Sequence, residues 1–209
     1  MSEKYIELYL GRHGQTFANL LGILQGWTHG RLTMRGLAET AELGFQMKDK
    51  EIEYVLCGNL GRQIQSTYQA NQWLMLDYNN IELTELLRER HLGNCEGKLS
   101  KDYGLAFQDN FKGNELYSKN STSLIKNPET LVEVTKRVDK LIEKIYSLGK
   151  SRIMTMGSGW INSYIINRLF GEEFIEHPQE NASAHYFLLN QHGEVEFYRL
   201  EKIKVNLKE

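Results

Sequence analysis

Short apolar runs alternate with longer segments of helical periodicity along most of the chain. The runs have the length of strands and are bounded by glycine or polar residues. We therefore expect strands at residues 5–10, 53–57, 81–87 and 152–156, and a hairpin from 184–189 and 194–200 around NQHG. The intervening segments predict helices at 34–48, 60–76, 128–148 and 160–170. Such alternation is typical of a three-layer α/β/α sandwich with a mostly parallel central sheet.

The third of these helices has the clearest pattern. Asn127 and Pro128 are expected to begin it by cap and first-turn chemistry, and Gly149 to end it. Its apolar positions recur at steps of three and four residues and form one stripe: Leu131, Val134, Val138, Leu141, Ile145 and Leu148. In the helix at 60–76, the expected core contacts are Ile64, Tyr68 and Trp73.

Residues 99–127 interrupt the alternation. The segment is rich in Ser, Asn, Gly and Lys, with scattered aromatic residues. A stretch of this length in a compact domain is typical of a lid over a binding site, and disorder is the equally weighted alternative. We see no repeat and no domain boundary. The prediction is therefore a single domain over residues 1–209 with a lid-like insertion at about 99–127.

The overall charge gives the chain no general attraction for polyanions. Its 25 basic and 27 acidic residues leave a net charge of −2, so we expect neither nucleic acid nor a membrane as a partner. An anion-binding role would rest on a local group of arginines. Two cysteines in dissimilar contexts, Cys57 and Cys95, and no signal-peptide-like or membrane-spanning apolar run favour the cytoplasm. No motif indicates a metal or another cofactor.

Four predicted strand ends carry the residues of chemical interest, because open α/β sheets bind ligands beyond the carboxyl ends of their strands. Arg12 and His13 follow the first strand, Arg62 opens the helix after the second, and Glu89 follows the third. Arginine matches phosphate oxygens, neutral imidazole is a nucleophile, and glutamic acid can protonate a leaving oxygen. Together these residues indicate phosphoryl transfer. The fourth strand ends in MTMGSGW, without charge or imidazole.

Three sequence blocks resemble the signature of the histidine phosphatase superfamily, in its phosphoglycerate-mutase-like branch. LGRHGQTFANLLGILQGWTHGRLTMRG is similar to the family's Arg-His-Gly-(Glu/Gln)-Thr motif with the Asn, Gln-Gly, Leu-Thr and Gly that follow it. NLGRQIQST resembles Leu-x-Arg-Ala-x-Gln-Thr, and LLRERHLGNCEG resembles Leu-x-Glu followed by Gly-x-Trp-Glu-Gly. The blocks keep the family's order and spacing, and the resemblance extends over nearly the whole chain. The resemblance implies a phosphoglycerate-mutase-like fold.

Residue by residue, the resemblance implies a pocket for a small-molecule phosphate ester. His13 would be the nucleophile that takes the phosphoryl group. Glu89 would protonate the leaving group and then activate water. The residues expected to bind phosphate or line its pocket are Arg12, Arg62, Asn19, Gln25 and Gly26. Homo-oligomerisation stays open.

The fourth block departs from the family at the position of its second histidine. The family reads roughly Val-Ser-His-Gly-Gly where this chain has Thr155 to Gly159, so that Gly157 replaces the histidine and Ser158 follows. Losing one electrostatic contact to a transferring group typically lowers the rate by about 10²–10³. Three interpretations are open: a natural variant with weak or absent catalysis, replacement by Ser158, water or another histidine, and a deliberate substitution. The further departures at Met156 and Ser158 favour the natural variant.

We therefore expect a metal-independent phosphatase that hydrolyses phosphate monoesters through a phosphohistidine at His13, with weakened activity. The alternatives are a catalytically impaired protein that binds phosphorylated ligands, and a phosphoglycerate mutase. Phosphatase is favoured over mutase because the insertion offers Lys101, Lys112 and Lys119 but no arginine to clamp a second acidic group.

Overall fold

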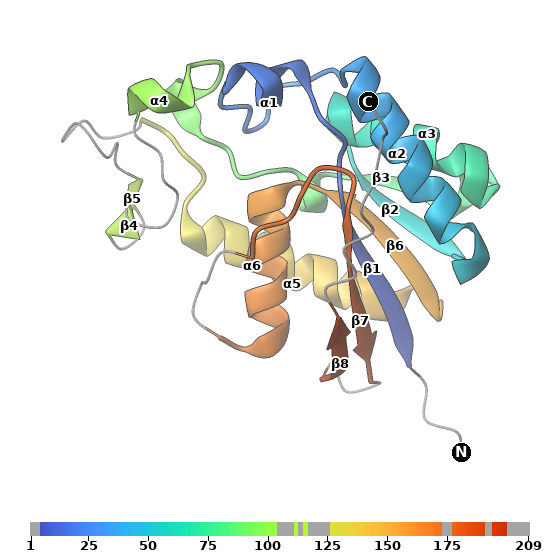
Figure 1. The fold of residues 1–209 in the computed structure, drawn as a ribbon. Coiled ribbons are helices and arrows are strands. Elements are labelled where there is room, and N and C mark those ends of the chain that lie inside the picture. Colours follow the sequence, from blue (N-terminus) through green and yellow to red (C-terminus); the bar gives the residue numbers. More distant parts are fainter. Residues whose placement is uncertain are drawn as a thin grey trace.

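Strands and helices alternate along the chain (Figure 1). The structure is a computed structural model and describes residues 5–103, 111–112, 115–116, 126–172, 177–190 and 194–199. The strands are β1 (Ile6–Arg12), β2 (Tyr54–Gly58), β3 (Ile81–Thr84), β4 (Phe111–Lys112), β5 (Glu115–Leu116), β6 (Arg152–Gly157), β7 (Ala184–Leu189) and β8 (Val195–Arg199). The helices are α1 (Phe17–Leu21), α2 (Met34–Met47), α3 (Gly61–Leu74), α4 (Ser100–Tyr103), α5 (Leu131–Ser147) and α6 (Gly159–Phe170).

The main sheet of the described strands has the order β3-β2-β6-β1-β7-β8. β1, β2, β3 and β6 are parallel to their neighbours in this group, whereas β7 runs antiparallel to β1, and β8 antiparallel to β7. The register of β1 and β6 places Arg12 beside Gly157. The predicted α/β sandwich with a mostly parallel sheet is confirmed, and β1 is an interior strand whose carboxyl end lies between β6 and β7.

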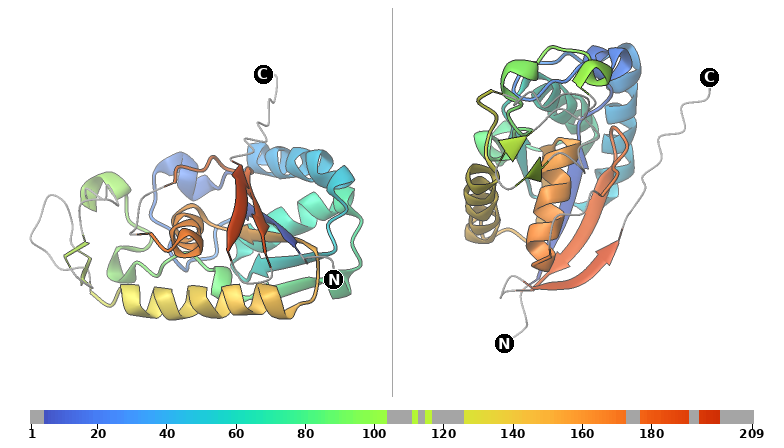
Figure 2. Two further views of the ribbon diagram at one scale, coloured as in Figure 1. Left: turned by 90° about the horizontal axis from the view of Figure 1, so that it is seen from below. Right: turned by 90° about the vertical axis from the view of Figure 1, so that its left-hand side faces the viewer.

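Helices cover both faces of this sheet, as Figure 2 shows. Because side chains alternate along a strand, Leu8 and Leu10 of β1 enter the core beneath α5 and α6, whereas Tyr9 enters the core beneath α2 and α3. The predicted stripe of α5 is confirmed: Val134, Val138, Leu141 and Ile145 are buried, with Leu131 and Leu148 packed beside them.

The expected core contacts of α3 are partly wrong. Ile64 packs against the core, but Tyr68 is 41% and Trp73 45% exposed. The buried face of α3 is instead polar or small and comprises Arg62, Gln63, Ser66, Thr67, Ala70 and Asn71. This face lies close to α2, because a Cβ atom on Gly44 would overlap the backbone of Ala70. Close helix packing therefore selects small residues here over aromatic ones.

Two predicted element boundaries are also wrong. α5 begins after Thr130, whose hydroxyl accepts from the Glu133 amide at 3.2 Å while the Glu133 carboxylate accepts from the Thr130 amide at 2.8 Å. This reciprocal capping box starts the helix three residues after Asn127, whose φ of 57° does not suit a cap. β3 ends at Thr84, because its hydroxyl accepts from the Leu86 amide and begins a 3₁₀ turn.

α1 and α4 lie together at the top of Figure 1, beyond the end of β1. Their flanking segments run side by side: Leu24 N donates to Lys98 O at 2.9 Å, and Ser100 N donates to Gly22 O at 2.8 Å. Much of the predicted lid-like insertion at 99–127 falls outside the described residues, so the lid and the single-domain prediction stay predictions. None of the helices described is long and apolar enough to cross a bilayer.

Candidate active site

The turn after β1 is fixed by backbone hydrogen bonds from both neighbouring strands. Arg12 N donates to Ser183 O at 2.9 Å on the β7 side, and His13 N donates to Gly157 O at 3.1 Å on the β6 side. The carbonyl of His13 accepts from Ala182 N at 3.1 Å. The position of His13 is therefore set by the main chain of two segments that are distant in sequence.

Two glycines allow this turn to approach α2. A Cβ atom on Gly14 would overlap the carbonyl oxygen of Gly36, and one on Gly36 would overlap that of Gln15. Thr33 caps α2 by accepting from Gly36 N at 3.0 Å. The first turn of α2 thus lies directly behind the turn that carries His13.

The imidazole of His13 is only 2% exposed. Its Nδ1 lies 2.8 Å from Gly14 O, and since a carbonyl can only accept, Nδ1 carries the proton and Nε2 keeps its lone pair. Burial lowers the pKa of His13 well below its ordinary value of 6.5, and the charges of Arg62 and Arg12 lower it further, against a raising effect of the bond to Gly14. His13 is therefore neutral at pH 7, as a nitrogen nucleophile must be.

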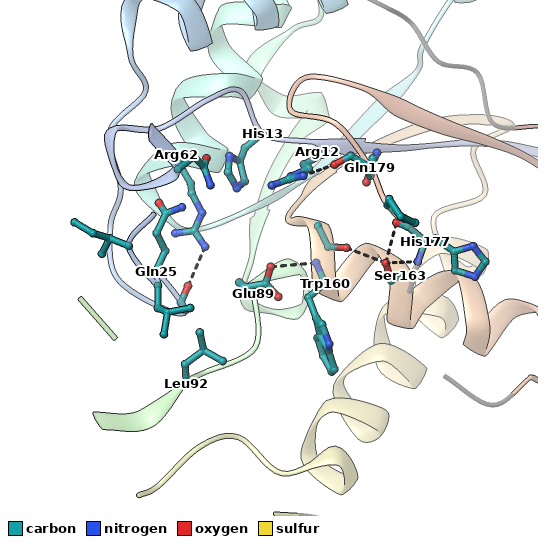
Figure 3. Close-up of a pocket in the computed structure, with 16 residues that line it drawn as sticks. Arg12, His13, Gln25, Arg62, Glu89, Leu92, Trp160, Ser163, His177 and Gln179 are labelled. Atoms are coloured by element: carbon teal, nitrogen blue, oxygen red, sulfur yellow. Dashed lines mark hydrogen bonds between the residues drawn. The ribbon is translucent and has the colours of Figure 1, made fainter. Parts of the chain in front are cut away.

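Arg62 projects from the first turn of α3 and is 1% exposed. Its Nη1 donates to Thr28 O at 2.8 Å and its Nη2 to Gly26 O at 2.9 Å. Burial lowers the pKa of Arg62 to about 10, against the raising effects of Glu89 and Glu96, so the side chain is charged at neutral pH. The 26–28 loop holds its guanidinium in place beside His13 (Figure 3).

Glu89 lies in the loop after the 3₁₀ turn Glu85–Leu87 and faces the start of α6. Its Oε2 accepts from Trp160 N at 3.2 Å, and its Oε1 accepts from Ile161 N at 3.2 Å and from Arg90 N at 2.8 Å. The carboxyl group thereby satisfies two of the amides that the first turn of a helix leaves without an intrahelical partner.

A partly buried ion pair fastens the Glu89 loop to α5. Arg137 donates from Nε and Nη2 to the two carboxylate oxygens of Glu129, both at 2.8 Å. Its Nη1 donates to the carbonyls of Leu86 and Arg88, also at 2.8 Å. Charge-assisted bidentate geometry of this kind is the strong form of the arginine–carboxylate pair, and it fixes the backbone directly before Glu89.

These elements enclose a cavity of about 300 Å³. Seven of the residues predicted from the sequence line it together: Arg12, His13, Asn19, Gln25, Gly26, Arg62 and Glu89. Figure 3 shows His13, Arg12 and Arg62 on one side and Glu89 with Trp160 on another. Asn19 reaches the cavity because it completes the capping box of α1 with Thr16.

Gly157 and Ser158 are outside the cavity lining. Ser158 is 1% exposed, and its hydroxyl lies 3.2 Å from Nε2 of Gln63, which donates to it, and 3.5 Å from Nη2 of Arg62. The cavity wall beside the end of β6 is formed by the start of α6, with Gly159, Trp160 and Ser163. Ser158 therefore supports Arg62 and offers no group to the cavity.

Apart from His13, His177 is the only histidine of the described part of the chain that lines the cavity. The ring of His177, a lining residue, points away from His13 in Figure 3. His185 is 1% exposed and its Nδ1 lies 3.0 Å from the hydroxyl of Tyr198. His91 Nδ1 lies 3.0 Å from Asn127 O. Among the residues described, no group of three or more His, Cys, Asp or Glu side chains could hold a metal ion.

Several lining residues were not predicted from the sequence, notably Leu92, Trp160, Ser163, His177 and Gln179. The sequence offers a signal that could have predicted His177 and Gln179. They precede β7, which is antiparallel to β1, and the start of an antiparallel strand lies at the same sheet edge as the end of its neighbour. The chain before β7 is thereby brought to the end of β1.

The fold and the cavity together define an α/β protein with a cationic pocket at the carboxyl ends of its parallel strands. A model of the histidine phosphatase superfamily (branch 1) matches residues 8–199. The chain therefore belongs to this superfamily.

The proteins that the chain is similar to include mutases in sequence, and mutases and phosphatases in fold. The 2,3-bisphosphoglycerate-dependent phosphoglycerate mutase of Treponema pallidum is 32% identical over 94 residues, which cover 44% of this chain but only 38% of that relative. The solved alpha-ribazole phosphatase of Shigella flexneri has a TM-score of 0.79 at 20% identity and covers 98% of this chain and 100% of that one. The phosphoglycerate mutase of Bacillus anthracis has a TM-score of 0.76 at 22% identity, covering 95% and 92%. These structures show the same fold.

Proposed function

We propose that the protein is a metal-independent phosphatase that hydrolyses small phosphate monoesters through a phosphohistidine on His13. The observation that carries the proposal is the neutral imidazole of His13 between two arginines, with Glu89 in the same cavity. Nitrogen nucleophile, cationic oxygen binders and a proton donor are the three parts that phosphoryl transfer to histidine requires.

In the first step, Nε2 of His13 attacks phosphorus and the bond from phosphorus to the ester oxygen breaks. Arg12 and Arg62 hold the phosphoryl oxygens, with Asn19, Gln25 and Gly26 around them. The leaving oxygen takes a proton from Glu89. We assign this proton to Oε2, because Oε2 accepts one amide whereas Oε1 accepts two.

In the second step, water attacks the phosphorus of phospho-His13. Glu89, now a carboxylate, takes the proton of this water, and the bond from Nε2 to phosphorus breaks. Inorganic phosphate leaves, and His13 returns to its neutral form. We propose a reduced rate, because Gly157 brings no side chain to the cavity and the electrostatic contact of a second histidine is missing.

Two alternatives follow from particular observations. A binder of phosphorylated ligands with little turnover is favoured by the absence of Gly157 from the lining, and phosphate release at enzyme-like rates would exclude it. A mutase would need a clamp for a second acidic group, and Arg12 and Arg62 are the only arginines or lysines among the described lining residues. Turnover dependent on 2,3-bisphosphoglycerate would establish a mutase instead.

We also propose the cytoplasm as the site of action. Cys57 and Cys95 are both free and buried, and burial raises the pKa of their thiols to about 12 and about 11. Thiols of this kind are inert structural residues and suit a reducing compartment.

Rapid-quench trapping tests the mechanism directly. Radiolabelled phosphate from a reactive monoester is expected to appear on the wild type as an acid-labile, base-stable adduct, with inorganic phosphate released in the presence of EDTA. His13→Ala is expected to lose both the adduct and the turnover. His29→Ala is the matched control, since His29 is exposed and outside the cavity. Unchanged turnover in His13→Ala would reject the mechanism.

A further inference from the structure

The space in front of Gly157 is occupied by the side chain of Asn162. A Cβ atom built on Gly157 would overlap Oδ1 of Asn162 and lie 3.4 Å from its Cγ and 3.6 Å from Cδ2 of Leu87. Asn162 comes from the first turns of α6 and is 0% exposed. Its amide oxygen therefore stands where any side chain at position 157 would begin.

Two hydrogen bonds fix the amide of Asn162 in this orientation. Nδ2 donates to the carbonyl of Gly11 at 3.0 Å and to Oε1 of Gln179 at 2.8 Å. Oδ1 is buried without a hydrogen-bond partner among the described residues. Turning the side chain away would break both bonds of Nδ2, because the two acceptors are held by β1 and by the chain before β7.

The same amide is linked to Arg12 through Gln179. The side chain of Gln179 donates from Nε2 to Leu10 O at 2.9 Å and to Ser183 O at 3.0 Å. The backbone carbonyl of Gln179 accepts from Nη1 of Arg12. Arg12 is confined on its other side by Gly159, since a Cβ atom there would lie 3.2 Å from Cζ of the guanidinium.

We infer that Asn162 is a positioning residue that orients Arg12 through Gln179, and that it takes the space a histidine at 157 would need. Glycine at 157 and asparagine at 162 are thus one coupled pair. The orienting role rests on the proposed function, in that Arg12 is the residue that holds phosphate. The steric coupling does not depend on any activity.

The coupling predicts how restoring a histidine behaves. Gly157→His alone forces its Cβ atom against a pinned amide in a close-packed site, which is overpacking. We expect the midpoint of thermal unfolding to fall by roughly 5 °C. Asn162→Ala removes the obstructing oxygen. It is expected to lower the midpoint of the wild type but to raise that of Gly157→His.

This reversal of sign is the test of the coupled pair. The four proteins of the cycle are compared by calorimetry, with Asn162→Ser as a second small replacement in case the alanine variant folds poorly. The coupling is contradicted if Asn162→Ala lowers the unfolding midpoint equally in the wild type and in Gly157→His. It is also contradicted if Gly157→His is as stable as the wild type.

The orienting role is tested by titration calorimetry with inorganic phosphate, which needs no turnover. Asn162→Ala is expected to weaken phosphate binding about tenfold, the loss of one charge-assisted contact. Asn167→Ala is the matched control: Asn167 is on the same helix, 2% exposed, and donates from Nδ2 to Ser163 O. It is expected to lower the unfolding midpoint and leave phosphate affinity within twofold.

The outcomes separate the inference from the proposed function. Equal phosphate affinity in Asn162→Ala and the wild type overturns the orienting role, and so does an equal loss in both asparagine variants. A wild type that binds no phosphate rejects the orienting role together with the phosphate pocket. A wild type that binds phosphate but releases none from esters rejects only the phosphatase. Phosphate binding and thermal unfolding then still test the two parts of the inference.

Discussion

β1 and β6 are neighbouring parallel strands, and both end beside the same cavity. Their last residues, Arg12 and Gly157, are paired in register. The end of β1 supplies side chains, since Arg12 and His13 line the cavity. The end of β6 supplies backbone: Gly157 O accepts from His13 N, and the α6 amides that follow hold Glu89. Equivalent positions at one sheet edge thus contribute in two different ways.

This difference shows which parts of the site need no side chain at position 157. His13, the two arginines and Glu89 are each held by contacts that involve no side chain at that position. The geometry of the cavity is therefore independent of a side chain at the end of β6. Each of the following predictions changes one side of this comparison.

The largest effect is expected on the α6 side, from Glu89→Gln. The amide keeps an acceptor for α6 but cannot donate a proton to the leaving oxygen, so kcat should fall about 10³-fold. The fall should be smaller for p-nitrophenyl phosphate, whose leaving group needs no proton, than for an alkyl phosphate. The control is Glu85→Gln, at an exposed site in the same stretch, and it should change kcat less than twofold. An equal fall in kcat with both substrates would contradict the role of Glu89 as the general acid.

Acid pH should lower stability through the β1 side of this comparison. The end of β1 carries the imidazole of His13, whereas the end of β6 carries none. Folding lowers the pKa of His13 well below 6.5, and burial, with a smaller effect of His177, lowers that of His185 on β7 to about 4. The unfolded chain then binds more protons below pH 6.5, so stability should fall between pH 6.5 and 4. The share of His185 is about 3 kcal/mol at pH 4.

Urea unfolding at a series of pH values measures this dependence. His13→Gln and His185→Gln should each flatten the acid side of the profile. A wild-type stability that is constant from pH 6.5 to 4 would show that neither buried histidine resists protonation.

Arg62→Lys tests the planar guanidinium group that lies beside His13 on the β1 side. Lysine keeps the charge but cannot satisfy the carbonyls of Gly26 and Thr28 and a phosphoryl oxygen in one plane, so kcat/KM should fall about 10²-fold. Arg152→Lys, at the opposite end of β6 and paired with Glu51 and Glu53, should change it less than twofold. Equal activities in both variants would show that charge alone suffices at position 62.

The smallest effect is expected from Ser158→Ala. If the hydroxyl of Ser158 took part in the reaction, its loss would cost a catalytic contact. Because its hydroxyl is directed to Gln63 and Arg62, we expect about 1 kcal/mol of lost stability and less than a fivefold change in kcat. A hundredfold fall in kcat would indicate that Ser158 takes part in the reaction.

The fold and the four residues of chemical interest in the cavity could be predicted from the sequence because they follow from local patterns. Strand length, helical period and glycine positions define the α/β order, and parallel strands bring their ends together. Arg12, His13, Arg62 and Glu89 were expected to meet on that ground, and they do. Their roles in catalysis stay predictions.

The remaining features depend on contacts between residues far apart in the sequence. Nothing near Ser158 indicates that its hydroxyl meets Gln63, 95 positions earlier. Nothing near Gly157 indicates that Asn162 fills its space, since both positions read as an ordinary strand-to-helix turn. The start of α5 was predicted too early because asparagine and threonine are both common N-cap residue types, and only the reciprocal bond between Thr130 and Glu133 decides for position 130.

The hydrogen bond from His13 N to Gly157 O has a consequence for how such a site changes over time. Every amino acid presents the same carbonyl, so an exchange at position 157 does not alter the anchor of His13. A side chain at this position would nevertheless meet the amide of Asn162, which Gly11 and Gln179 hold in place. A lineage that regains a side chain at position 157 must therefore also change position 162, so the two positions evolve together.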